Sequence, residues 1–63
     1  MRFQIEILRD IGGRTDVVYS ATIDEMSPHR ARVKAGGLLN LYSGRGANVA
    51  RILNDKGEEL YRF

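Results

Sequence analysis

The sequence predicts an α+β protein with the element order ββαββ. Two β-hairpins form a four-stranded sheet, and one amphipathic helix packs on one face of it. Three observations support this: alternation of apolar and polar residues over 2–24 around a Gly-Gly pair, helical spacing over 27–46, and two apolar runs over 49–63 separated by a turn. Two hairpins and a helix can bury their apolar faces together when the helix covers one side of the sheet.

A chain of 63 residues is expected to form one domain, residues 1–63, because it has room for one hydrophobic core. It contains 43% hydrophobic and 29% charged residues, the balance of a globular rather than a disordered chain. No apolar run approaches the roughly 20 residues of a membrane helix. The first residues alternate with charges, unlike the core of a signal peptide. We therefore expect a cytoplasmic protein with no membrane association.

Strict alternation predicts the first hairpin. Phe3, Ile5 and Ile7 fall on one side of a strand over residues 2–7. The alternation resumes over residues 17–24, after two glycines that tolerate a positive φ. Two such strands around a Gly-Gly loop indicate an antiparallel hairpin.

The helix is predicted to begin at Ser27-Pro28, where the serine caps free amides and the proline occupies the first helical position. Gly44 is expected to end it in the left-handed conformation. Four residues at helical spacing form its inner face: Ala31, Ala35, Leu38 and Tyr42. Gly36-Gly37 lies in mid-helix and costs about 1 kcal/mol per glycine, so a break there is the alternative.

The second hairpin comprises runs at 49–53 and 58–63 around an Asp-Lys-Gly turn. We favour a two-residue turn at Lys56-Gly57. That turn places four apolar side chains on one face: Ala50, Ile52, Tyr61 and Phe63. A longer turn favours Ile52 with Leu60. The first strand is expected to be central, beside either the third strand in an antiparallel sheet or the fourth strand in a mixed one.

Positive charge is concentrated in the middle of the chain, since residues 26–54 contain five Lys or Arg and no acid. His29 and Arg30 lie in the first helical turn, where a cation opposes the helix dipole. This arrangement suggests contact with an anion or a nucleic-acid backbone. The candidate contacts are His29, Arg30, Arg32, Lys34, Arg45 and Arg51. Against it, no aromatic cluster interleaves with these cations as a base-stacking platform requires.

The outer helix surface offers a competing hypothesis, a homodimer or a protein partner. Four residues form a strip that is nearly free of side chains: Val33, Gly36, Gly37 and Asn40. Small residues allow another backbone to approach closely, and the open sheet edges offer a second route. The structural alternative is that the glycines only ease packing within the chain.

Enzymatic chemistry is not expected. The chain has one His and no Cys, and Ser27 near His29 is explained by capping. The glycine pairs match no phosphate-binding loop, and Asp24, Glu25 and His29 are a poor set of metal ligands. We therefore expect no catalytic residue, cofactor, metal or small-molecule substrate. The sequence favours a non-catalytic binding protein acting through self-association or a protein partner, with weak anion or nucleic-acid binding as the alternative.

Overall fold

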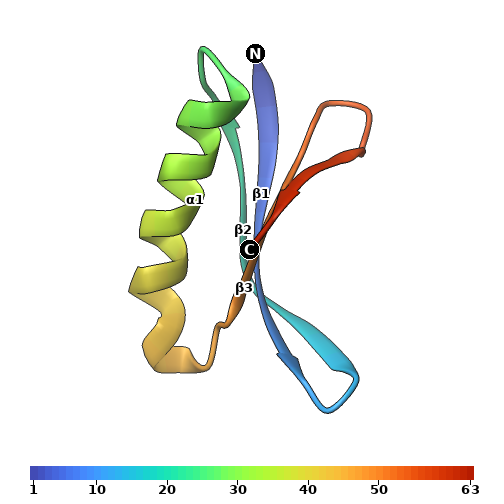
Figure 1. The fold of residues 1–63 in the computed structure, drawn as a ribbon, viewed down its shortest axis with the longest axis vertical. Helices are drawn as coiled ribbons and strands as arrows, with labels where there is room; N and C mark the ends of the chain where they lie inside the picture. The colour runs from blue at the N-terminus through green and yellow to red at the C-terminus, as the bar shows by residue number, and fades with distance from the viewer.

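The computed structural model describes residues 1–63 and has one antiparallel sheet with a single helix on one face (Figure 1). The elements are β1 (Arg2–Ile11), β2 (Arg14–Asp24), α1 (Pro28–Tyr42), a 3-10 turn (Ser43–Arg45), β3 (Val49–Leu53) and β4 (Glu59–Arg62). The strand order is β2-β1-β3-β4. The predicted ββαββ fold is confirmed. The central β1 pairs with β3, so the mixed sheet is wrong.

The first hairpin is longer than the alternation predicted. Ile11 pairs with Arg14 across Gly12 and Gly13, whose φ angles are 60° and 79°. Positive φ at both central positions matches the twist of the flanking strands. A register shift beside Ile7 leaves Val18 as an extra residue in β2, and such a bulge increases the twist. The tip of the hairpin extends beyond the end of α1, as Figure 1 shows.

The helix is continuous through Gly36-Gly37, as the main interpretation predicted, so the alternative of a break there is wrong. Ser27 caps it as predicted, because its hydroxyl accepts from the Arg30 amide at 3.2 Å. The predicted end at Gly44 is also wrong. The chain continues through the 3-10 turn, and Gly46 has the left-handed φ of 89°. The extra turn leads the chain to Ala47, which is buried at the start of the return to the sheet.

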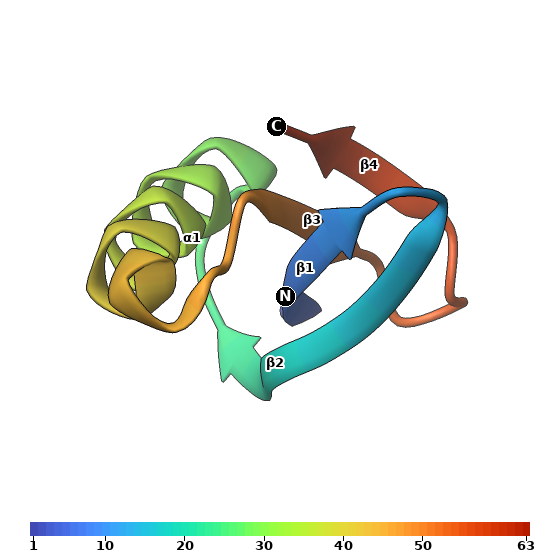
Figure 2. The same ribbon diagram turned by 90° about the horizontal axis from the view of Figure 1, so that it is seen from below.

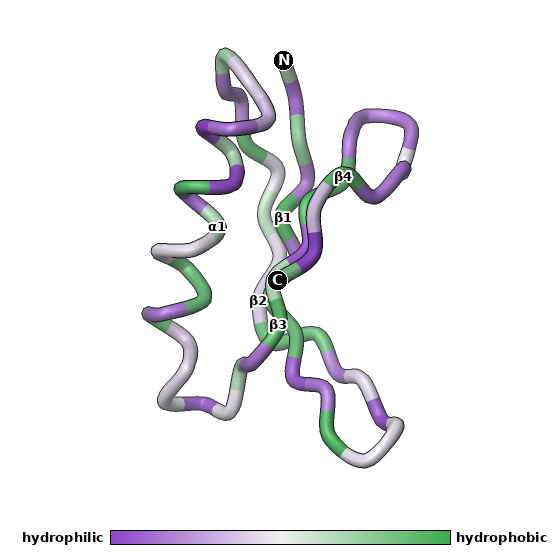
Figure 3. Tube along the Cα trace, viewed as in Figure 1, coloured by the Kyte–Doolittle hydropathy of each residue, from purple (hydrophilic) through white to green (hydrophobic).

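One layer of side chains between helix and sheet, small or β-branched except for Phe3, forms the core. Its fully or nearly buried members are Phe3, Ile5, Ile7, Ala31, Ala35, Ala47, Ala50 and Ile52. The predicted inner face of α1 is confirmed, since Leu38 and Tyr42 also pack against this cluster. Figure 2 shows that no helix covers the other face of the sheet. In Figure 3 the most continuous hydrophilic stretch is the β3–β4 turn.

The second hairpin has the predicted face but not the predicted turn. Ile52 pairs with Tyr61 as expected, and Tyr61 packs against the core. Nearer the turn the register shifts by one residue, so that Leu53 pairs with Glu59. The turn is therefore longer than two residues. Asn54 stabilises it, because its side-chain oxygen accepts from the amides of residues 56 and 58, each at 2.9 Å.

Candidate binding surfaces of the helix

The first turn of α1 presents an imidazole and a guanidinium to solvent. His29 and Arg30 are exposed, and the turn contains no acid. The two acids that precede the cap have other partners. Asp24 binds the N-terminal amine at 3.1 Å, and Glu25 lies 3.6 Å from the Lys34 ammonium. The cationic character of this turn therefore persists in the folded chain, whereas Lys34 is partly neutralised.

Arg32 reaches from α1 towards the end of β4. Its guanidinium carbon lies 5.6 Å from the ring centre of Tyr61 and 5.3 Å from that of Phe63. These distances are within the range of cation–π interactions. The expectation that no aromatic cluster interleaves with these cations is therefore wrong at Arg32. This contact could have been predicted from the second hairpin, because the apolar face expected there includes Tyr61 and Phe63 and packs towards the helix.

Arg45 belongs to a separate cation–aromatic group at the other end of the helix. Its guanidinium carbon lies 5.8 Å from the ring centre of Tyr42. Tyr42 in turn stacks on Tyr19 of β2, with ring centres 4.8 Å apart and planes 16° apart. β2 and β4 are opposite edges of the sheet, so Arg45 and Arg32 flank the helix on different sides.

Arg51 lies on the face of the sheet that the helix does not cover. Its strand neighbours Ala50 and Ile52 are in the core, and side chains alternate along a strand. Its Nε lies 3.1 Å from a carboxylate oxygen of Glu6 and 3.5 Å from one of Glu59. That Nε is buried and makes no aligned hydrogen bond, so the contact is an ion pair. Arg51 is thus neutralised and separate from the helix cations.

The four residues proposed for a partner surface do not share one environment. Gly36 is half-buried, and a Cβ there would lie 3.9 Å from the Phe63 ring. For this glycine, packing within the chain is a sufficient explanation. Val33, Gly37 and Asn40 are exposed, and a Cβ at Gly37 would meet no atom within 4 Å.

Leu41 is a surface residue that sequence reasoning left out of this strip. It follows Gly37 by four residues, as Gly37 follows Val33, so the three form one stripe along α1. Val33 is 65% exposed and Leu41 is 70% exposed. The same i, i+4 spacing in the sequence could have revealed it. We call Val33, Gly37 and Leu41 the outer stripe.

Three shallow hollows lie on the surface. One of about 280 Å³ is at the hairpin tip, beside Arg9 and Arg14, and one of about 420 Å³ is beside the β3–β4 turn. The third, of about 190 Å³, brings together two of the candidate anion contacts and two of the four residues proposed for a partner surface. Its lining residues are His29, Arg32, Val33, Gly36 and Phe63.

These observations define a small α+β protein whose unexplained surface features are concentrated on its one helix. No three His, Cys, Asp or Glu side chains converge as metal ligands would. None of the helices is both long enough and apolar enough to cross a membrane. Comparison of the chain with protein-family models, with curated proteins and with solved structures finds no match in any of the three.

Proposed function

We propose that this chain is a non-catalytic interaction protein that forms a symmetric dimer through the outer stripe of α1. The observation that supports the proposal is an exposed glycine with a large exposed apolar residue one helical turn to either side. Single exposed apolar residues are common on protein surfaces and need no explanation. Here Val33 and Leu41, 65% and 70% exposed, lie on one stripe with Gly37 between them.

Gly37 is costly for the isolated chain. Glycine in a helix interior is less favourable than alanine by about 1 kcal/mol. Open space surrounds this position, so packing within the chain does not require the missing side chain. Gly36 differs, since it faces Phe63. A close approach of another backbone at Gly37 would account for the glycine.

A second copy of the chain fits the stripe in an antiparallel arrangement. With Gly37 on the twofold axis, Val33 of one copy faces Leu41 of the other. Lys34 then faces Asn40, so the cation nearest the axis opposes a neutral residue. A parallel pair would bring the cations of the two helices together. The antiparallel pair also aligns the two helix dipoles favourably.

The stripe is small, which limits the strength of the dimer. It runs along a single helix of 15 residues. Interfaces that bury less than about 1,200 Å² in total are typical of weak, transient complexes. We therefore expect a dimer that dissociates on dilution. The close backbone approach follows from ridge-into-groove packing of the i±4 rows, which commonly cross at about −50°.

Sedimentation equilibrium over a wide concentration range tests the proposal. Gly37→Gln should leave the fold intact, because the position is open and glutamine favours helix, but it should abolish dimerisation. Lys56→Gln is the control, since Lys56 is exposed in the β3–β4 turn, away from α1. A wild-type chain that stays monomeric near millimolar concentration would refute the proposal. Equal effects of the two variants would refute the interface.

A further inference from the structure

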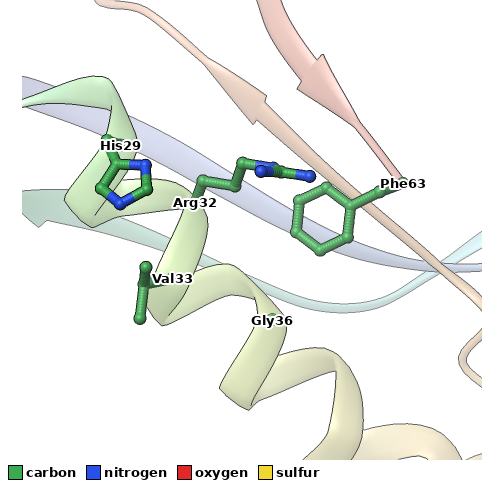
Figure 4. A pocket seen from close by; sticks show the side chains of 5 residues that line it. All are labelled: His29, Arg32, Val33, Gly36 and Phe63. Carbon is green, nitrogen blue, oxygen red and sulfur yellow. The ribbon is translucent and has the colours of Figure 1, made fainter.

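The hollow between α1 and the end of β4 shares Val33 with the outer stripe, but its other lining residues are not part of the proposed dimer interface. Four of its lining residues occupy positions i, i+3, i+4 and i+7 of α1, which form one face of a helix. They are His29, Arg32, Val33 and Gly36, and Phe63 completes the hollow from the other side. Figure 4 shows Arg32 extending across to Phe63 and His29 one turn earlier on the helix.

The charge around this hollow is not compensated. Most other cations of the chain are within 4 Å of a carboxylate: Arg9, Arg14, Lys34, Arg51 and Arg62. Arg30 and Arg32 have no such partner, and no carboxylate lies within 4 Å of the His29 imidazole. The nearest acid before the helix, Glu25, is engaged by Lys34. The hollow therefore favours an anion.

Arg32 is held in place before any ligand binds. Its guanidinium lies over the rings of Tyr61 and Phe63, which restricts the side chain without neutralising it. A planar guanidinium can bind a phosphate through two hydrogen bonds and can also stack on a nucleobase. A preordered side chain loses less conformational entropy on binding.

The walls of the hollow favour a ring. Val33 and Phe63 are apolar, and Phe63 remains 37% exposed. Gly36 has no side chain to fill the space beneath the Phe63 ring. Complete small-molecule pockets measure about 300–1,000 Å³. The volume here, about 190 Å³, has room for one planar ring with the rest of a ligand outside.

We propose that this hollow binds a nucleotide unit, with its base against Phe63 and Arg32 and its phosphate on His29 and Arg32. An inorganic anion would use only the cations, and an acidic peptide would leave the ring-binding wall empty. The nucleotide can be free or part of a single strand, since both present the same base and phosphate. The proposal does not depend on dimerisation.

The test is an amide NMR titration of the full chain at low salt, below the concentration of self-association. The probes are AMP, a short oligoadenylate, inorganic phosphate and hexaglutamate. We expect AMP to shift the amides of His29, Arg32, Gly36 and Phe63 saturably, with a dissociation constant of about 1 mM. Phosphate and hexaglutamate should bind at least tenfold more weakly than AMP. A tenfold difference in the dissociation constant corresponds to about 1.4 kcal/mol of binding free energy.

Two variants and a control localise the site. Arg32→Gln should weaken AMP binding by about tenfold, the effect of losing one charge-assisted contact. Phe63→Leu should weaken AMP binding while leaving the weak phosphate shifts unchanged. Lys56→Gln removes the same charge from the β3–β4 turn and should change AMP affinity less than twofold.

Each outcome of the titration is decisive. Oligoadenylate binding more tightly than AMP supports a unit of a single strand, and equal affinities support a free nucleotide. The absence of saturable shifts at up to 10 mM AMP, a concentration about ten times the expected dissociation constant, overturns the proposal. So does equal weakening by Arg32→Gln and Lys56→Gln, which indicates unspecific charge. Hexaglutamate binding as tightly as AMP would point to an acidic peptide instead.

Discussion

Gly44 and Gly46 lie two residues apart, yet only Gly46 occupies a position that requires glycine. Gly46 has φ 89°, and a Cβ there would lie 3.0 Å from Cδ of Arg9. Both the left-handed conformation and the close approach favour glycine. Gly44 has neither a positive φ nor an atom within 4 Å of a Cβ position. The chain therefore turns back towards the sheet at Gly46, after the 3-10 turn.

Gly46→Ala is expected to lower the free energy of unfolding by about 1–2 kcal/mol, the cost of a left-handed non-glycine residue. Gly44→Ala should leave that free energy unchanged or raise it slightly. Urea denaturation of both variants measures the difference. A larger loss for Gly44→Ala would mean that the helix ends at Gly44 after all.

Arg32 and Arg51 show how the surroundings of one residue type determine what it can bind. Arg51 lies near the carboxylates of Glu6 and Glu59 on neighbouring strands. Arg32 faces two aromatic rings and no acid. An arginine with paired acids holds strands together, whereas one stacked on rings keeps its hydrogen-bond donors available for a ligand. Only Arg32 therefore enters a binding proposal.

At the scale of elements, Asn48 fixes the connection between α1 and β3. Its Oδ1 accepts from the Asp10 amide, and its Nδ2 donates to the Asp10 carbonyl, both at 2.8 Å. The Asn48 amide also donates to the carbonyl of Leu8 at 2.9 Å. One side chain thus extends the pairing of β1 beyond the start of β3. It ties the helix return to the long first hairpin.

Asn48→Ala should lower the free energy of unfolding by about 1–3 kcal/mol, because it removes two hydrogen bonds worth about 0.5–1.5 kcal/mol each. Hydrogen exchange at the Asp10 amide should accelerate in the same variant. Asn40→Ala is the control, since Asn40 is exposed in the last turn of α1 and alanine favours helix. If both variants unfold at the same urea concentration, the hydrogen bonds of the Asn48 side chain do not contribute to stability.

The whole molecule depends on a thin core. Ten of its 63 residues are buried, and the largest fully buried side chains come from β1 and β3. A chain of this length is expected to have a free energy of unfolding of about 3–9 kcal/mol. A single core change therefore consumes a large fraction of that free energy. The long hairpin tip, in contrast, lies outside the core and contributes little to it.

Ile52→Val should lower the free energy of unfolding by about 0.5–1.5 kcal/mol, as for other buried isoleucines. Ile11→Val makes the same chemical change where the side chain is 63% exposed, so its effect should be close to zero. Thermal or urea unfolding of the pair gives the comparison. Equal losses would indicate that the hairpin tip is buried in solution, for example by another molecule.

Local sequence patterns predicted most of the fold. Alternation along residues 2–7 predicted the inward face of β1, and Ser27-Pro28 predicted the start of α1. Turn lengths were harder to predict. The left-handed glycine is two residues later than expected, and a register shift in the second hairpin produces a turn longer than two residues. In both places several local conformations are close in energy, and packing of Ala47 or Tyr61 selects between them.

The sequence by itself therefore determined the element order, the inner face of the helix and the excess of cations between residues 26 and 54. These properties follow from hydrophobic period, capping and composition, which act within a few residues. Only the tertiary structure divided those cations into separate groups. Glu6 and Glu59 reach Arg51 through strand pairing, and Tyr61 and Phe63 reach Arg32 through packing of β4 near the helix. Such contacts join residues far apart in the chain, and no local pattern encodes them.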